Sequence, residues 1–504
     1  MRYNRYMKIP EIVKEISAVI RKRGGRAIIV GGAVRDALLH IPSKDYDIEV
    51  YGFSSLLELE KILSSFGSVN LVGKSFGVLK FVYEKEIYDF SFPRFEKKRG
   101  KGHRDFEVVT DGTLSFKEAS RRRDFTMNAM GYEIETGTFL DPYHGRRDMK
   151  EKRLRHIEGK TFIEDPLRVY RAVQFSARFD YRLVEETQVL CKEMVEKGML
   201  EALPKERVYE EIKKMLLKAE HPSIGFESMY QLGITSRYFP ELHALRGIPQ
   251  ELKWHLEGDV WVHTMLALDK MSELLRVKSK ESSIGEKQKL KLLFAVLCHD
   301  FGKVSTTTLE LENGEILSWD EYQKREFLDK KMINKSYTVR RIRAIGHEQA
   351  GLVPTERFLY RLMNEHSFIK AVLPLVSEHM KPLQLYAQGA KSGAIRRLAM
   401  KVIIEELVCV AKADFLGRAT EEAKKGVYLA GEWLLQKAKA LKVEKKPLEP
   451  LVKGRDLIAL GMQPSALFKK ILDEVYCCQL EGKCKTKEEA LDYIGKNYTL
   501  SPSK

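Results

Sequence analysis

The 504-residue sequence predicts an α+β domain at its N-terminal end, followed by domains that are mostly helical. About the first 150 residues mix short strand patterns with helical ones, whereas the remainder shows mainly helical periodicity. The strand patterns are too few for a doubly wound sheet, so a large α/β fold is excluded. At roughly 100–200 residues per domain, the length allows three to five domains.

The elements of the α+β part follow one another closely. Residues 12–20 place isoleucines and valines on one helical face, and Gly24 and Gly25 supply the stop. A short buried strand is expected at 27–30, directly before a second glycine pair. Alternating apolar residues predict further strands at 46–51, 78–83 and 87–92.

Four later segments mark the organisation of the chain. The basic, glycine-bearing stretch 92–114 predicts a mobile loop. Asp165 and Pro166 are expected to form an N-cap and first-turn pair, after which helical patterns dominate. Glycines and a proline cluster at 245–258, which indicates a domain boundary, and the lysine-rich segment 437–450 is a candidate linker.

The composition narrows the class of protein. Lys and Arg number 87 against 71 Asp and Glu, which gives a formal net charge of +16 and favours a polyanionic partner, either nucleic acid or an anionic membrane. The six cysteines show no paired zinc spacing and are too few for a disulfide scaffold, so reduced intracellular thiols are expected. No apolar run approaches ~18 residues, and the basic start lacks a signal-peptide core. We therefore expect a cytoplasmic protein without a membrane span.

Paired carboxylates form the first candidate site. Asp45 and Asp47 are separated by one residue on an expected strand, so both point to one face, roughly 7 Å apart. Two carboxylates on one face repel each other unless a cation lies between them. Their spacing suits magnesium bridging a triphosphate in nucleotidyl transfer. Asp89, on a later strand, is either a third carboxylate of this site or a solvent-facing strand residue.

The glycine pair lies just before these carboxylates. Gly31 and Gly32 follow the first strand, and Arg35 comes three residues later. Free backbone amides in such a turn bind phosphate oxygens, and a guanidinium neutralises them. We expect these residues to hold the phosphates of a nucleotide.

The motifs that follow resemble those of the class II tRNA nucleotidyltransferases, or CCA-adding enzymes, and of the bacterial poly(A) polymerases. The resemblance rests on GGAVRDALL, KDYDIE, RRRDFTMNA at 121–129, EDPLRVYRAVQFSARF at 164–179 and LPKERVYEEI at 203–212. It covers about the first 220 residues in the order of the family. It implies a polymerase β-like nucleotidyltransferase head that uses Mg²⁺. Residues similar to the flexible loop of full CCA-adding members are Arg94, Glu96, Lys97, Gly100, Gly102, His103 and Phe106.

The same resemblance implies nucleotide contacts. Arg123 and Asn128 match family positions beside the nucleotide. Asp165, Arg168 and Arg171 recur at helical spacing and share one face. An aspartate accepts from the exocyclic amine of cytosine or adenine, and an arginine donates to an acceptor atom of the ring. Uracil and guanine carry a carbonyl in place of that amine. The pair Asp165 and Arg168 would therefore admit CTP and ATP and reject UTP and GTP. Gln174 stands where some relatives carry arginine, which puts one contact in doubt.

A second constellation lies in the helical half. His263, the adjacent pair His299 and Asp300, and Asp414 follow one another in widely separated segments. Ionisable groups at the end of an apolar helix are costly unless a metal or another partner satisfies them, and this donor set suits manganese, nickel or zinc. The pattern resembles the HD-domain phosphohydrolases, whose binuclear members carry further histidines that match His347 and His379. The alternative is a vestigial HD fold that only packs.

Together these observations predict a template-independent enzyme that adds or repairs the 3′-terminal CCA of tRNA from CTP and ATP. The same chain is expected to carry an HD phosphohydrolase site, whose substrate the sequence does not identify. The expected domains are a head at 1–150, a helical neck and body at 151–245, an HD domain at 246–425 and a tail at 426–504, whose segment 452–476 resembles the family tail. The alternatives are a CC-only or A-only enzyme, a poly(A) polymerase, an RNA-binding protein with an inactive head, and a protein in which the HD module does the main work. The oligomeric state stays open.

Overall fold

The computed structural model describes residues 7–43, 45–70, 77–98, 106–110, 112–281, 284–333 and 338–498. The chain forms two units. Unit 1 comprises Met1–Ile212 and Gln231–Gly233, and unit 2 comprises Lys213–Tyr230 and Ile234–Lys504.

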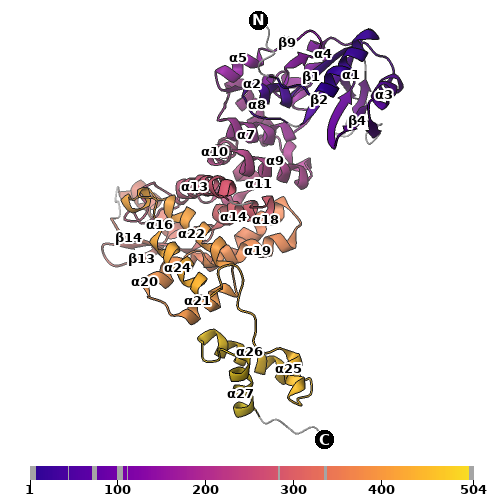
Figure 1. Ribbon diagram of the computed structural model, residues 1–504. Coiled ribbons are helices and arrows are strands. Elements are labelled where there is room, and N and C mark those ends of the chain that lie inside the picture. Colours follow the sequence, from indigo (N-terminus) through magenta and orange to yellow (C-terminus); the bar gives the residue numbers. More distant parts are fainter. Residues whose placement is uncertain are drawn as a thin grey trace. The chain divides into compact units, whose positions relative to one another are not determined.

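A seven-stranded mixed sheet forms the frame of unit 1 (Figure 1). Its order is β3-β4-β5-β2-β1-β8-β9, and β2 with β5 is its parallel pair, while the other neighbours run antiparallel. The strands predicted at 27–30, 46–51, 78–83 and 87–92 are confirmed within a residue. The strand bounds are β1 (Arg26–Val30), β2 (Tyr46–Tyr51), β3 (Ser68–Asn70), β4 (Val78–Tyr83), β5 (Glu86–Ser91), β8 (Gly131–Glu133) and β9 (Thr138–Leu140).

Short helices cover this sheet. α1 (Glu11–Lys22) buries Ile12, Val13, Ile16 and Ile20 and packs against β1, as its apolar face predicts. β1 is buried from its second residue to its last, because another apolar cluster, with Tyr51 and Phe116, covers Ile28 and Val30. The remaining helices of this part are α2 (Gly32–Leu38), α3 (Leu56–Ser64) and α4 (Phe116–Ser120).

The predicted mobile loop at 92–114 is wrong for part of its length. β6 (Arg94–Lys98) and β7 (Phe106–Thr110) pair antiparallel, with Arg94 opposite Thr110 and Lys98 opposite Phe106. The aromatic and β-branched residues of β7 favour a strand. The glycine-bearing segment 99–105 lies outside the described residues.

Helices complete unit 1, and an aromatic cluster ties them to the sheet domain. Phe125 is fully buried, and its ring centroid lies 5.7 Å from that of Phe162 and 5.8 Å from that of Phe175. This cluster joins the segment after the sheet to α7. The remaining elements are α5 (Gly145–Lys150), α6 (Gly159–Phe162), α7 (Leu167–Phe179), α8 (Glu185–Glu196), α9 (Lys205–Lys218), the 3₁₀ turns η2 (Thr126–Asn128) and η3 (Met199–Ala202), and the short strands β10 (Arg153–Leu154) and β11 (Arg182–Leu183).

Unit 2 is mostly helical, as predicted, and is built around four packed helices. α14 (Glu286–Cys298) is buried from Leu292 to its end, because α13 (Val260–Glu281), α19 (His366–Glu378) and α22 (Ile404–Leu416) surround it. Around them lie α10 (Ser223–Gln231), α11 (Ile234–Tyr238), α12 (Pro240–His243), α15 (Lys303–Thr306), α17 (His347–Ala350), α18 (Leu352–Leu362), α20 (Lys381–Ala387), α21 (Ser392–Ala399), α23 (Glu421–Lys424) and α24 (Leu429–Ala440).

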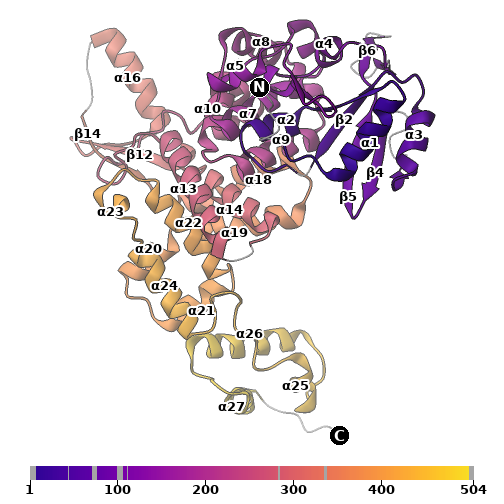
Figure 2. The same cartoon turned by 45° about the horizontal axis from the view of Figure 1, so that its top comes forward.

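A small sheet in unit 2 was not anticipated from the sequence. β12 (Thr307–Leu311) lies between β13 (Ile316–Ser318) and β14 (Val339–Ala344), and all pairs are antiparallel. α16 (Trp319–Ile333) contacts β12 and β13, and Figure 2 shows it projecting from the sheet that contains β12 and β14. Leu309, Leu311 and Tyr322 form a buried apolar cluster between this helix and the sheet.

The last helices form a cluster with its own core. α25 (Gly454–Ala459), α26 (Ala466–Glu481) and α27 (Lys487–Asn497) bury Leu457, Ile471 and Ile494 together. Residues 441–450 contain no helix or strand, whereas the start of the predicted linker, 437–440, belongs to α24. The four-domain division stays a prediction. Among the described residues, no helix is both long and apolar enough to cross a membrane.

Candidate functional site

The sheet of unit 1 brings the three predicted carboxylates to one place. Asp47 of β2 is the direct partner of Asp89 in the parallel pair with β5, so the two side chains lie on the same face. Asp45, which immediately precedes β2, is exposed. On the other side, Asp47 pairs with Val30, the residue before the glycine turn. The carboxylates and the glycine turn therefore lie close together, at the same end of the neighbouring strands β1 and β2.

The electrostatics of this cluster fit a divalent cation. The pKa of Asp47 is raised, first by burial and then by the charges of Asp89, Glu49 and Asp45, while Arg123 opposes the shift. Asp89 Oδ1 is buried and has no hydrogen-bond partner among the residues that the structure describes. A donor set of carboxylate oxygens with unneutralised charge suits Mg²⁺.

The glycine turn makes room for an arginine. Gly31 has φ 70°, and a Cβ atom there would lie 2.7 Å from Nη1 of Arg123. The guanidinium of Arg123 donates to Glu49, with 2.9 Å between Nη2 and Oε1. Gly32 begins α2. The structure thus places predicted Arg123 beside the predicted turn, and its nucleotide contact stays a prediction.

Two other predicted residues belong to a buried polar chain. Arg35 is 5% exposed and donates to Asn128 Oδ1 at 2.7 Å and to Asp36 at 2.8 Å. Its guanidinium also lies over the rings of Phe175 and Phe179. Because these groups enclose Arg35, its role in the structure is to hold α2 against α7. Direct phosphate binding by Arg35 and nucleotide binding by Asn128 stay predictions.

The chain continues to α7 through Asp124. The amide of Asn128 donates to Asp124 Oδ1 at 2.9 Å, and Arg171 Nε donates to Asp124 Oδ2 at 2.7 Å. Burial alone would raise the pKa of Asp124, but the charge of Arg171 and three hydrogen bonds lower it instead. Glu211 of α9 lies 3.9 Å from Arg171. Sequence reasoning missed Asp124 and Glu211, although both lie inside the quoted motifs.

The predicted base-reading residues are individually anchored. Asp165 Oδ1 accepts from the amide of Leu167 at 3.2 Å, and its Oδ2 lies 3.3 Å from Arg207. Arg168 donates to the carbonyls of Thr161 and Arg122, each at 2.6 Å. The helix starts after Pro166, so Asp165 caps it from one residue further out than expected. Arg207 was missed by sequence reasoning, although it stands in the motif LPKERVYEEI.

Gln174 differs from its neighbours on α7. It is 2% exposed, so it lies inside unit 1. Its Nε2 has no hydrogen-bond partner among the described residues. This burial was not predicted from the sequence. The expectation that one nucleotide contact is lost because Gln174 replaces an arginine stays a prediction.

In unit 2 the predicted HD residues converge. His263 Nε2 lies 3.0 Å from Asp414 Oδ1 and 3.8 Å from Asp300 Oδ2. His299 Nε2 lies 3.2 Å from the same Asp300 oxygen, and His347 Nε2 lies 3.4 Å from Oδ1. His379 joins through His347, with 3.3 Å between their Nε2 atoms. All six side chains are buried. A pocket of about 320 Å³ is lined by four of them, Asp300, His347, His379 and Asp414, and also by Trp254, Lys303 and Arg418.

Three of these histidines face the cluster in one defined tautomer. The Nδ1 atoms of His299, His347 and His379 each lie 2.6–2.8 Å from the main-chain carbonyl three residues earlier. A carbonyl can only accept, so each Nδ1 carries the proton and each Nε2 is turned inward. Burial lowers the pKa of His379 to about 3, so this ring is neutral.

The carboxylates of the cluster are held ionised. Burial alone would raise the pKa values of Asp300 and Asp414, but nearby cations hold both well below their usual range: first His299 for Asp300, and first Arg418 for Asp414. Lys303 Nζ lies 2.8 Å from Asp300 Oδ2. His299 Nε2 and both oxygens of Asp300 nevertheless have no hydrogen bond of good geometry within the described chain. Nitrogen and oxygen donors left in this state fit a divalent metal.

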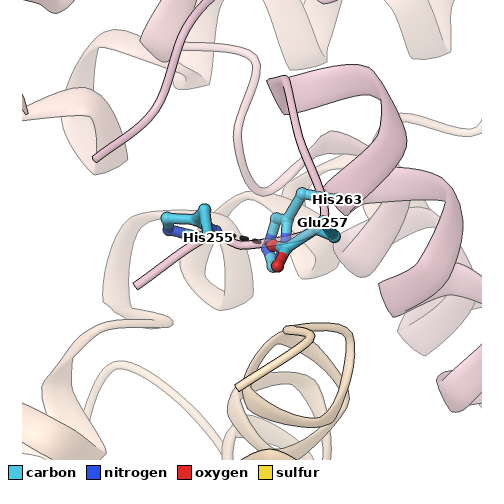
Figure 3. Close-up of side chains that lie close together, drawn as sticks. All are labelled: His255, Glu257 and His263. Carbon is cyan, nitrogen blue, oxygen red and sulfur yellow. Dashed lines mark hydrogen bonds and ion pairs between the residues drawn. The ribbon is translucent and has the colours of Figure 1, made fainter. Parts of the chain in front are cut away.

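A carboxylate that sequence reasoning missed, that of Glu257, contacts His263 at Nδ1, the ring nitrogen that does not face Asp414 (Figure 3). Glu257 has a 2% exposed side chain, and its Oε1 lies 2.8 Å from Nδ1 of both His255 and His263. Burial lowers the pKa of His255 to about 4, so it is neutral. Burial would raise the pKa of Glu257, but the two histidines and the amide of Ala419 lower it. The spacing HLEGD was the available signal.

The chain matches known proteins along most of its length. Residues 27–155 match the poly A polymerase head domain, and 180–246 match the probable RNA and SrmB-binding site of polymerase A. A multifunctional CCA protein of Mannheimia succiniciproducens is 39% identical over 400 residues, which cover 77% of this chain and 84% of that protein. One from Xanthomonas euvesicatoria is 31% identical and covers 86% and 93%.

The chain belongs to the multifunctional CCA protein family. One member, from Stenotrophomonas maltophilia, is 38% identical over 55% of this chain and 63% of its own length. Solved structures of CCA-adding enzymes share the fold. An apo form has TM-score 0.62 at 20% identity and covers 97% of both chains. The Bacillus stearothermophilus enzyme in complex with CTP has TM-score 0.62 at 19% identity and covers 97% of this chain and 98% of its own.

Membership in this family confirms the predicted class of enzyme, a nucleotidyltransferase with an α+β head followed by helical parts. It does not test the individual site residues. Their roles therefore rest on the geometry described above.

The buried carboxylate of Asp124 generates a prediction about stability. Because its pKa is lowered on folding, it stabilises the protein fully above the ordinary carboxyl value of about 3.9, and this contribution is lost as pH falls through the folded pKa. Asp124→Asn removes the nearer of the two carboxylates of Arg171 and leaves only Glu211 at 3.9 Å, so we expect a loss of about 3–5 kcal/mol at pH 7. Chemical denaturation at pH 7 and pH 3 measures this loss, which should shrink at the lower pH. Asp180→Asn removes an exposed ion pair with Lys152 and should change little; an equal effect of both variants contradicts the prediction.

Proposed function

We propose that this chain adds or repairs the 3′-terminal CCA of tRNA, using CTP and ATP without a nucleic-acid template. The observation that carries the proposal is the group Asp45, Asp47 and Asp89 at the edge shared with the glycine turn, in a chain of the multifunctional CCA protein family. A related solved structure, the Thermotoga maritima CCA-adding enzyme complexed with tRNA, covers 97% of this chain at 20% identity, with TM-score 0.58. The net charge of +16 suits a polyanionic tRNA. A cytoplasmic location is part of the proposal.

The head residues have distinct tasks in this reaction. Asp45, Asp47 and Asp89 would hold Mg²⁺, which supplies charge stabilisation at the triphosphate and at the attacking 3′-hydroxyl. Arg123, beside Gly31, would donate to the triphosphate or the sugar. These residues leave the choice of base to another part of unit 1.

The base is chosen by α7. Asp165 would accept from the exocyclic amine of cytosine or adenine, and Arg168 would donate to the ring acceptor beside it. Uracil and guanine present a carbonyl to Asp165 instead, which repels the carboxylate. The anchors of Arg168 on two main-chain carbonyls keep the pair rigid.

The direct test is incubation of the full chain with tRNA lacking CCA and with labelled CTP and ATP, separately and together. Two cytidines followed by one adenosine support the proposal. Addition that stops after CC, an A-only product, a poly(A) product or no product would identify one of the alternatives.

A second function is favoured by the HD cluster. We infer that His263, His299, Asp300, His347, His379 and Asp414 hold manganese, nickel or zinc and hydrolyse a phosphate ester. The proposal is supported by Asp300, which lines a pocket, and by Nε2 of His299 beside it, because neither side chain's inner atoms make a hydrogen bond of good geometry within the described residues. A 2′,3′-cyclic phosphate at a damaged tRNA end is the substrate that would connect the two functions, because it blocks nucleotide addition. A vestigial HD fold is the alternative.

Loss of a head carboxylate tests the first site. Asp45→Ala or Asp47→Ala should abolish incorporation of both CTP and ATP, because several kcal/mol of transition-state stabilisation are lost, while tRNA binding persists. Incorporation and gel-shift assays measure the two properties. Glu86→Ala, an exposed change on the same strand as Asp89, should leave incorporation unchanged. Near-normal turnover of Asp47→Ala would refute the assignment.

Substitution of Asp165 tests the choice of base. Asp165→Ala should relax discrimination against UTP by at least about one order of magnitude, because each unpaired buried polar group costs ~1–3 kcal/mol. Single-turnover rates with CTP and UTP give the ratio. Glu164→Ala removes the neighbouring carboxylate and should preserve the ratio. A CTP preference that survives in Asp165→Ala counts against this role.

Asp300 tests the HD activity. Hydrolysis of 2′,3′-cyclic nucleotides should require a divalent metal and be lost in Asp300→Ala, while CTP incorporation continues. Asp320→Ala removes an exposed carboxylate from α16 in the same unit and should have no effect. Bound metal and hydrolysis are measured in all three proteins. Absence of both from the unsubstituted protein would establish the vestigial alternative.

A further inference from the structure

The histidines of the HD cluster do not all use the same kind of partner for Nδ1. His299 and His379 lie just past the C-terminal ends of α14 and α19, where the helix leaves carbonyl lone pairs free to accept from the ring. His347 likewise uses the carbonyl of Ala344. His263 differs, because its Nδ1 lies against the carboxylate of Glu257.

The position of His263 in its helix explains the difference. It lies in the first turn of α13, where the free main-chain groups are N–H donors rather than carbonyls. Its own amide donates to the carbonyl of Asp259, and the carbonyl of Val260 accepts from the Thr264 hydroxyl. An acceptor for the ring must therefore come from a side chain.

Glu257 is built into the fold as that acceptor. Its Oε1 receives the Nδ1–H groups of His255 and His263, and its Oε2 accepts from the amide of Ala419 at 2.9 Å (Figure 3). Both oxygens thus have protons directed at them. A cation among His255, Glu257 and His263 would have to displace two of these protons, so the trio is a hydrogen-bonded support and not a metal site of its own.

The support has a consequence on the opposite edge of the ring. With the proton of His263 on Nδ1, Nε2 is an acceptor and faces Asp414 Oδ1 at 3.0 Å. Two acceptors at this separation repel each other unless a proton or a cation lies between them. The arrangement favours a cation on the side of Asp300 and Asp414.

We propose that Glu257 is a positioning residue of the HD metal site: it fixes the tautomer and orientation of His263 so that Nε2 is presented to the metal. The inference rests on the proposed metal-binding function of the HD cluster. A carboxylate behind a ligating histidine also increases the basicity of the ring, and loss of such a partner typically weakens metal affinity 10–100-fold.

Calorimetric titration of the full chain with Ni²⁺, in the presence of excess Mg²⁺ to occupy the all-oxygen head site, tests the proposal. Glu257→Ala should bind Ni²⁺ 10–100-fold more weakly than the unsubstituted protein, and Glu257→Gln, which keeps an acceptor but not the charge, should lie between them. Asp259→Asn is the matched control, because Asp259 stands in the same loop and its carboxylate accepts from the amides of Gly247 and Val262 rather than from a histidine ring. It should bind Ni²⁺ normally.

A second measurement needs no metal. Long-range ¹H–¹⁵N spectra of histidine-labelled protein report the tautomer of His263, assigned by the signal missing from His263→Asn. The ring should be protonated at Nδ1 in the unsubstituted protein and in Asp259→Asn, and should populate the Nε2 tautomer in Glu257→Ala. CTP incorporation by unit 1 and the thermal midpoint show that the variants are folded.

The outcomes separate the inference from the function on which it rests. Normal Ni²⁺ affinity and an unchanged His263 tautomer in Glu257→Ala would overturn the role of Glu257 and leave the HD site standing. An unsubstituted protein that binds no Ni²⁺ would overturn the metal site and the role together. Equal weakening in Asp259→Asn and Glu257→Gln would show that loop charge, and not contact with His263, sets the affinity.

Discussion

The ion pair between Asp124 and Arg171 is the interaction on which the rest of unit 1 depends. Through Asn128 it reaches Arg35 behind the glycine turn, and through Arg171 it holds α7. Phe125 packs its ring on Phe175 of the same helix. The turn beside the carboxylates and α7, which begins two residues after Asp165, are therefore joined by one chain of buried contacts. A protein that chooses bases without a template needs this rigidity, because its own side chains replace the pairing partner.

Unit 2 solves a different electrostatic problem. Burying several histidines and carboxylates together is costly unless each polar atom has a partner. The Nδ1 atoms contact main-chain carbonyls or Glu257, so the Nε2 atoms of the histidines are turned toward the carboxylates. Arg418 and Lys303 form ion pairs with these carboxylates. This division between bonded outer atoms and inner atoms without good hydrogen bonds is the feature that supports the proposed metal site.

Much of this could be predicted from the sequence, and the failures have physical reasons. The strands that carry Asp47 and Asp89 were predicted because alternation is a local signal, and the HD residues because their pattern of types is unusual. The contacts of Arg35 with Asn128 and of Glu257 with the amide of Ala419 could not be predicted, since each joins segments far apart in the chain. The contacts of Glu257 with His255 and His263 are local, so their signal was present but was missed. The pairing of β6 with β7 was not predicted, because the glycine-rich and basic composition of the segment between these strands is typical of a loop. The sheet of β12, β13 and β14 was not predicted, because its central strand is only five residues long and α16 separates β14 from the other two strands in the sequence.

The strand β14 has a consequence for how the HD cluster is built. β14 pairs with β12 across a long loop, its Ile342 amide is held by Glu251, and its last residue, Ala344, supplies the carbonyl that orients His347. His263, His299, His379 and Asp414 lie on or directly beside helices of the central bundle, whereas the ring orientation of His347 is set by the last residue of a strand. The small sheet therefore contributes to the geometry of the cluster, although it lies outside the bundle that carries the other residues.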